Sequence, residues 1–286
     1  MQGEMTKPII QIGSRLGFLT LLLMIVAFAG HPTYLAQGLA VACIIIVCAH
    51  AVAAIGWVEA LAFAGICLTV TFTIENIGVR TGFPFGHYAF LVGGGLPHIG
   101  DIPLIVGPLY FGMGYPSWVI ANLLVGERVE RPTSVLQLFA VPLTAAFVMV
   151  QWDVVMDPAN STLARAWIWY DGGGYFGVPL SNFFGWFIVT YLYFQVFAIL
   201  LYRRRTRPPV FEHSASFWAV PILLYLAAGL CHVPSLLDPD MRLVDQSHRT
   251  WSESDLHETG VIVMLFTMLP TSLLALLRLK RSPIAP

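Results

Sequence analysis

Long apolar runs separated by short polar segments dominate the pattern of this chain. A helix that crosses a membrane needs about 20 mostly apolar residues. Eight stretches approach that length, at roughly residues 15–30, 34–54, 57–78, 103–125, 134–156, 180–202, 214–237 and 256–278. The turns at His31-Pro32-Thr33 and around Gly56 leave very short connections between the first three. The pattern therefore predicts an all-α fold: a polytopic integral membrane helix bundle of about 8 transmembrane helices, with residues 1–286 as a single integral membrane domain.

The basic residues are distributed unevenly between the predicted loops. With eight spans and both termini in the cytoplasm, eleven of the 15 lysines and arginines fall on the cytoplasmic side. The other four are Arg80, Arg165, Arg242 and Arg249. Cytoplasmic loops are enriched in lysine and arginine, so this split supports both the number of spans and their orientation. The polar loops after the third, fifth and seventh spans then share the outer face.

Composition narrows the class of protein further. The 286 residues are 57% hydrophobic and 11% charged, against about 25% charged in soluble domains. The net charge of −1 gives no reason to expect a nucleic acid partner. All four cysteines lie inside apolar runs without a CxxC pair, which indicates neither a disulfide framework nor a zinc site. We expect an integral protein of the cell (inner) membrane that binds no metal.

Glu75 lies at the end of the third span, in TFTIENIGV. The dipole at a helix C-terminus and the low-dielectric surroundings both disfavour a charged carboxylate. One interpretation is a neutral glutamic acid that can donate a proton. The other is an ion pair with Arg80 at the membrane surface.

A second pair of carboxyl groups lies in QWDVVMDP. Asp153 and Asp157 are four residues apart, so they share one helical face, near the helix end that Pro158 predicts. Like charges at this spacing repel, which favours one shared proton. The pair is a candidate for acid–base catalysis, although a capping role for Asp157 or a bound cation also fits the pattern.

Two histidines near the last two spans form a further cluster with neighbouring acids. His232 follows the seventh span in CHVPSLLDPD, and His257 opens the eighth in SESDLHETG. Acidic residues are favoured in a first helical turn, which gives Asp255 and Glu258 a structural explanation. A structural role is favoured for His257 too, whereas His232 is evenly balanced.

Aromatic residues surround these acids in the sequence. An aromatic belt at the membrane interface would explain many of them. The segments GFPFG and WIWYDGGGYFGVP alternate rings with glycine and proline, however, which indicates irregular backbone that lines a cavity. Aromatic faces there could stabilise a cation. The rings are Phe83, Phe85, Tyr88, Phe90, Trp152, Trp167, Trp169, Tyr170, Tyr175 and Phe176.

The chain lacks the sequence motifs of several well-known enzyme classes. The chain has no HxxxH or HxxHH box, Walker loop, GxSxG or HExxH. The spacing of Asp153 and Asp157 is only a weak version of a diphosphate-binding aspartate motif. From the residues alone, the protein is either an enzyme that acts on a lipid or a carrier of one.

Three features resemble the carotenoid biosynthesis membrane proteins that include the carotenoid 1,2-hydratases. They are ENIGVRTGFPFGHY, WDVVMDP together with WIWYDGGGYFGVPLSNFFGW, and the spacing between them. The resemblance covers most of the chain from the third span to the sixth. Hydratases of this family act on γ-carotene, lycopene or bisanhydrobacterioruberin. The segment AFLVGGGLPHIGDI departs from the family's pattern, which leaves the accepted carotenoid open.

The resemblance implies a hydro-lyase that needs no cofactor. It would add water across the terminal C1=C2 double bond of a ψ end group, with Glu75, Asp153 and Asp157 as candidate catalytic acids and bases. Candidate substrate-binding residues are Arg80, Phe83, Phe85, Tyr88, Trp152, Trp167, Trp169, Asn182, His232 and His257.

The expected partner is a carotenoid within the lipid bilayer, and other carotenoid-pathway membrane enzymes are candidates for association. Two alternatives stay open. One is a Mg²⁺-dependent isoprenoid transferase that would hold diphosphate on Asp153 and Asp157. The other is a carotenoid- or lipid-binding membrane protein without catalytic activity.

Overall fold

The fold is a bundle of helices with three two-stranded ribbons, seen in a computed structural model that describes residues 33–93, 95–126, 132, 134–204 and 214–281. The α-helices are α2 (Thr33–Ile55), α3 (Trp57–Thr81), α4 (Val106–Val125), α5 (Val135–Pro158), α6 (Leu180–Arg203), α7 (Ala215–Leu230), α8 (Glu253–Phe266) and α9 (Met268–Arg281). A π-helical turn, Ala159–Leu163, extends α5, and a 3-10 helix, Val233–Leu237, follows α7. The strands are β1 (Tyr88–Phe90), β2 (His98–Ile99), β3 (Ile102–Pro103), β4 (Trp167–Trp169), β5 (Arg242–Val244) and β6 (Thr250–Ser252).

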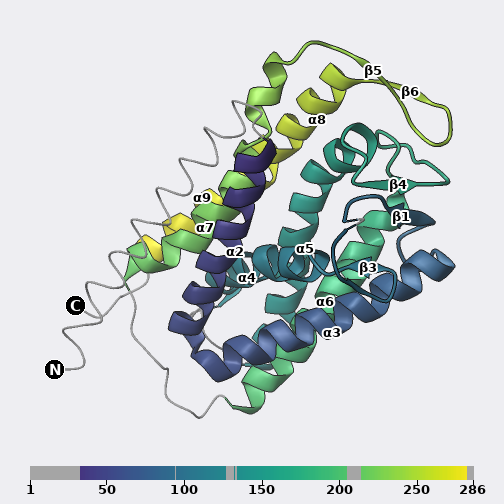
Figure 1. Cartoon of the computed structure of the whole chain (residues 1–286). Helices are drawn as coiled ribbons and strands as arrows, with labels where there is room; N and C mark the ends of the chain where they lie inside the picture. Colours follow the sequence, from purple (N-terminus) through teal and green to yellow (C-terminus); the bar gives the residue numbers. More distant parts are fainter. Residues whose placement is uncertain (1–32, 94, 127–131, 133, 205–213, 282–286) are drawn as a thin grey trace.

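Helix α4 forms the centre of the bundle. It packs against α2, α3, α5, α7 and α9 (Figure 1), and 15 of its 20 residues are buried. Gly107 allows the close approach to α3, because a β-carbon there would collide with Leu68 and Phe72 of that helix. A helix buried on all sides is apolar all round rather than amphipathic. The packing around α4 fixes the positions of the helices that carry the polar residues described below.

Five described helical segments are long and apolar enough to cross a membrane, and they match five of the predicted spans. They are Trp57–Thr81, Val135–Leu163, Leu180–Arg203, Ala215–Leu237 and Glu253–Leu279. The last is divided, because α8 ends at Phe266 and α9 begins at Met268. The helical membrane-protein class that the hydropathy pattern predicts is therefore supported by the structure.

The remaining three predicted spans compare differently with the helices of the structure. The stretch 34–54 coincides with the 23-residue helix α2. The stretch 103–125 coincides with the central helix α4, which is not among the five apolar segments. The stretch 15–30 lies outside the described residues. The total of eight and the cytoplasmic termini stay predictions.

Two local predictions can be compared directly with the backbone. The short connection at Gly56 is confirmed, with φ of 85°, a left-handed conformation that glycine adopts at little cost. Helix α5 ends at Pro158 as expected, but the π-helical turn continues the coil as far as Leu163.

One of the three ribbons joins loops that are far apart in the chain. Strand β1 pairs antiparallel with β4, which aligns Tyr88 with Trp169 and Phe90 with Trp167. In Figure 1 this ribbon lies on the side of the bundle away from α7 and α9, while the β5–β6 hairpin leads directly into α8. The ribbon therefore brings the two aromatic segments of the sequence together.

Candidate active site

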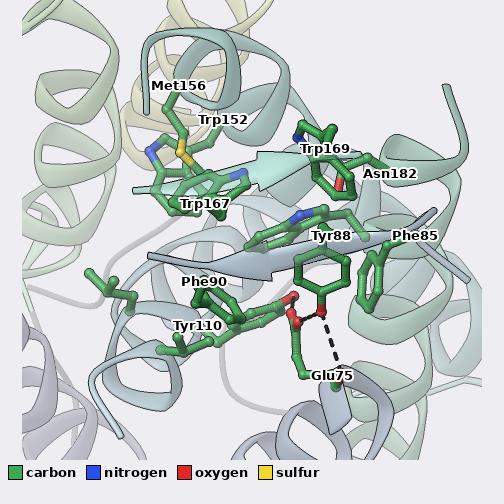
Figure 2. A pocket seen from close by; sticks show the side chains of 13 residues that line it. Glu75, Phe85, Tyr88, Phe90, Tyr110, Trp152, Met156, Trp167, Trp169 and Asn182 are labelled. Carbon is green, nitrogen blue, oxygen red and sulfur yellow. Dashed lines mark hydrogen bonds between the residues drawn. The ribbon is translucent and has the colours of Figure 1, made fainter. Parts of the chain in front are cut away.

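Glu75 is a buried carboxyl group near the C-terminal end of α3, with only 4% of its surface exposed. The Tyr110 hydroxyl, from α4, donates a 2.5 Å hydrogen bond to Oε1, and the Tyr88 hydroxyl, from β1, donates one to Oε2 (Figure 2). Burial, and then the charge of Glu75, raise the pKa of Tyr88 well above its usual value, so this phenol keeps its proton. Each carboxyl oxygen of Glu75 therefore has a phenol donor.

Arg80 does not pair with Glu75. Its Nε lies 2.8 Å from Oδ2 of Asp101, in an ion pair at the surface. Five residues along an α-helix turn a side chain by about 140°, so Arg80 faces away from Glu75. The interpretation of Glu75 as half of a surface ion pair is therefore wrong.

Asp153 and Asp157 project from one face of α5, as their spacing predicts, and both are fully buried. The Asn182 amide, from the first turn of α6, donates to Oδ2 of both aspartates, at 3.1 Å and 2.5 Å respectively. Oδ1 of Asp157 also accepts from Trp167 Nε1 at 2.8 Å, and Trp169 Nε1 lies 3.5 Å away. Within the described residues, Oδ1 of Asp153 has no donor. Asp157 is thus rich in donors and Asp153 is poor in them.

The segment after α3 is fastened by close packing. The Phe85 ring is buried between α3 and α6, where a β-carbon at Gly78 or Gly185 would collide with it. His87 Nδ1 then lies 2.7 Å from Oδ2 of Asp171, which ties the ribbon together at the surface. This packing confirms that the glycine- and proline-rich segment is ordered backbone inside the protein, as its composition predicts.

A cavity of about 70 Å³ lies between Glu75 and the Asn182 amide. Tyr110 stacks on Trp186 with ring centroids 4.3 Å apart, and Trp152 meets Trp186 edge-on. A dry cavity of about 150 Å³ holds benzene, so this one suits a branched group of a few carbon atoms. It is lined by Glu75, Phe85, Tyr88, Phe90, Val106, Leu109, Tyr110, Trp152, Met156, Trp167, Trp169, Asn182 and Trp186 (Figure 2).

The structure brings most of the predicted site residues to this cavity. Those in its lining are Glu75, Phe85, Tyr88, Trp152, Trp167, Trp169 and Asn182. Asp153 and Asp157 contact the lining through Asn182 and Trp167 rather than facing the space themselves. Among the residues described, Glu75 provides the cavity's only carboxyl group.

Four predicted substrate-binding residues do not line the cavity. Arg80 is directed to Asp101, and Phe83 is 68% exposed. His232 lies where α7 meets the 3-10 helix. His257 is buried in the first turns of α8, with Nε2 3.5 Å from Glu253. A substrate-binding role for these four has no geometric support here.

Sequence reasoning missed several residues of the cavity. Tyr110 and Trp186 lie inside apolar helices, and only packing shows that they face Glu75 and the cavity. A signal for Tyr110 was present, because a tyrosine within a buried helix needs a partner for its hydroxyl. The sequence does not distinguish Val106, Leu109 and Met156 as cavity residues, because apolar residues are common throughout membrane helices.

Metal coordination can be examined from the donor atoms. In the parts of the chain that the structure describes, no group of three or more His, Cys, Asp or Glu side chains could hold a metal ion. Both oxygens of Asp157 instead accept N–H donors, and a cation would compete with these donors for the same lone pairs.

These features define a helical membrane protein with an aromatic cavity between two groups of buried carboxyl residues. The chain belongs to the carotenoid biosynthesis protein family, whose sequence model matches residues 35–243. This result confirms the family that the motifs suggested.

One curated relative has a named activity. The chain is 32% identical over 118 residues to a protein of Haloarcula japonica named bisanhydrobacterioruberin hydratase. The match covers 41% of this chain and 38% of that relative, so it spans well under half of either protein. No solved structure matches the chain.

Proposed function

We propose that this protein is a carotenoid hydratase that adds water across the terminal C1=C2 double bond of a ψ end group. The observation that carries the proposal is the placement of one phenol-bound carboxyl group, Glu75, in an otherwise aromatic and apolar cavity. The family and the name of the Haloarcula japonica relative support the same chemistry. The cavity volume suits the terminal branched carbons, while the rest of the polyene would lie outside it.

Glu75 would be the proton donor. Protonation of an alkene needs an acid whose conjugate base is stabilised at the moment the proton leaves. Hydroxyl groups of Tyr88 and Tyr110 are positioned to donate to both oxygens of the resulting carboxylate. Before the transfer, one phenol oxygen can accept instead, because a tyrosine hydroxyl serves as donor or acceptor. The proton would pass from Glu75 to C2 and leave a tertiary cation at C1.

The aromatic walls would shelter that cation. Faces of tryptophan attract positive charge most strongly among aromatic side chains. Trp152, Trp167, Trp169 and Trp186 all line the cavity. Because the surroundings are apolar, the cation would meet few competing nucleophiles before the intended water molecule.

Asp157 would take the proton from water. Its three N–H neighbours favour the carboxylate form, whereas Asp153 has only the Asn182 amide. Two adjacent buried carboxyl groups favour sharing one proton, which then belongs on Asp153. Because Asp157 lies behind the cavity lining, the proton of the attacking water would reach it through a second water molecule as the water oxygen bonds to C1. That proton must return to Glu75 before the next turnover, and a water molecule in the cavity could carry it.

The experiment that tests this proposal uses cells that accumulate lycopene or γ-carotene and express the full chain. Hydration would raise the pigment mass by about 18 mass units, one water molecule, in the presence of a chelator as well as in its absence. Isotope-labelled water would place its oxygen in the product. Unchanged pigment that co-purifies with the protein would favour a carrier, and a product lost on chelation would favour the transferase.

We further propose that the protein works within the cell membrane, where its substrate is dissolved.

A further inference from the structure

A second cavity lies on the other side of Trp169 from the first. Its polar lining comes from Ser161 and Thr162 of the π-helical turn, from Arg165, and from Asp245 and Gln246 after β5. It is partly open at a rim where Arg165 is exposed. Neither the proposed proton transfer nor the substrate cavity uses these residues.

The volume of the second cavity limits which ligand it can hold. Its volume is about 20 Å³, against about 70 Å³ for the substrate cavity. A cavity needs about 10–15 Å³ and several polar partners to hold one water molecule. The second cavity therefore accepts a water molecule and excludes any part of a polyene. Its hydroxyl, carboxylate and amide groups can provide the hydrogen bonds that an ordered water needs.

Trp169 forms a shared wall between the two cavities, because it lines both of them. Its indole N–H lies 3.5 Å from Oδ1 of Asp157, which is long for a hydrogen bond. Trp167 holds the same oxygen at 2.8 Å. Asp157 thus keeps its orientation if Trp169 shifts. On the floor of the cavity, the buried hydroxyl of Ser161 donates to the backbone carbonyl of Asp157 at 2.8 Å.

The local backbone is shaped to form this space. The turn Ala159–Leu163 is π-helical, and its end is marked by a hydrogen bond from the Ala164 N–H to the Ala159 carbonyl. Such turns are rare and are frequently found at functional sites. The next residue, Arg165, has φ of 53°, which is uncommon for a residue other than glycine. An ordinary continuation of α5 would not place Ser161 and Thr162 in this arrangement.

Asp245 forms part of the opposite wall of the second cavity. It accepts hydrogen bonds from the Trp251 indole, the Arg249 backbone N–H and the Ser247 hydroxyl, at 2.8, 2.9 and 2.8 Å. Burial alone would raise the pKa of Asp245, but these hydrogen bonds bring it below its ordinary value. The wall therefore remains a carboxylate at neutral pH and stays hydrophilic.

We infer that the second cavity is a water-binding site, and that water reaches Asp157 from it past Trp169. This inference rests on the proposed hydration. It separates the paths of the two reactants: the polyene end enters an aromatic space, while water arrives from the opposite side through a polar one. Water delivered beside Asp157 would approach the face of the cation that is away from Glu75.

The test fills the second cavity from its outer wall. Gln246→Trp and, independently, Val244→Trp place a large side chain at residues that line it. Leu237→Trp is the matched control, because Leu237 is 90% exposed and is not among the lining residues. The full-length variants are expressed in carotenoid-accumulating cells, and their membranes are equilibrated in D₂O before pigment masses are measured.

We expect hydration to fall about a hundredfold in both filled variants, the order of loss that follows when a reactant is displaced. The recovered unhydrated carotenoid should gain deuterium, because the acid still adds a deuteron to C2 and the cation, lacking water, returns a proton. The control should hydrate as the unaltered chain does. Hydration at the unaltered rate in the filled variants would overturn the inference, as would loss of hydration without deuterium uptake. Failure of the hydratase proposal itself is distinguishable, because the unaltered chain would then form no hydrated pigment.

Discussion

The two groups of carboxyl residues beside the cavity differ in how their charge is stabilised. The glutamate wall, formed by Glu75, Tyr88 and Tyr110, presents its carboxyl group to the cavity and gives each oxygen a phenol donor. On the other side, the aspartate wall, formed by Asp153, Asp157 and Asn182, keeps both carboxyl groups behind the lining, with one amide between them. A carboxyl group that faces the substrate suits proton donation, whereas one that is reached through polar neighbours suits the handling of water.

The largest expected effect comes from removing the acid of the glutamate wall. Glu75→Gln keeps the shape but has no acidic proton, and hydration should fall by about 10²–10⁴-fold. The fall in hydration is measured as the amount of hydrated carotenoid formed per cell, normalised to the amount of the protein in the membrane. Glu59→Gln is the matched control, since Glu59 is also buried in α3 but lies at its opposite end. An active Glu75→Gln protein would mean that the aspartate wall supplies the acid.

The next effect separates the two aspartates. Asp157→Asn removes the proposed base and should lower hydration roughly a hundredfold. Asp153→Asn should lose about tenfold or less, because a neutral amide resembles the protonated form that repulsion favours at this position. Hydration rates of the two variants, measured in the same kind of membrane, show which aspartate is the base. Equal losses, or the reverse order, would contradict the assigned roles.

A smaller effect is expected from each phenol of the glutamate wall. Tyr110→Phe and Tyr88→Phe each remove a hydrogen bond to a carboxylate, worth about 1.5–3 kcal/mol, or about 10–100-fold in rate. Because the bond strengthens as charge develops on Glu75, the loss should fall on kcat with KM little changed. A change confined to KM would assign the tyrosines to substrate binding instead.

Arg80 and Phe83, which line neither cavity, should matter little to hydration. Arg80→Ala removes a surface ion pair, and such pairs contribute about 0–1 kcal/mol. Phe83→Ala truncates an exposed ring. Both variants should hydrate within about twofold of the unaltered protein. A larger loss, measured at equal protein levels, would extend the site beyond the cavity described here.

The smallest effect concerns the hairpin beside the aspartate wall. The pKa of Asp245 is lower in the fold than in the unfolded chain, so its stabilising contribution is present at neutral pH and is lost as pH falls through the folded pKa. Proteolysis within residues 242–252 should therefore increase in acid, and Asp245→Asn should show that sensitivity already at neutral pH. A hairpin equally protected in both proteins at every pH would contradict this.

The sequence anticipated the parts of the site that depend on local geometry. The common face of Asp153 and Asp157 follows from their four-residue spacing, and both are buried there. Arg80 shows where local reasoning failed, because proximity in sequence suggested a pair that the helical turn separates.

The amino-acid sequence by itself determined the class of protein and five of its apolar helical spans. The length and apolarity of a run are local properties, and a bilayer leaves the backbone few structures that satisfy its hydrogen bonds. Only the tertiary structure decided that Tyr110 meets Glu75, that Phe90 lies beside Trp167, and that two cavities flank Trp169. These relations join residues dozens of positions apart. They depend on how the helices and loops pack, and the period of a single helix carries no information about that.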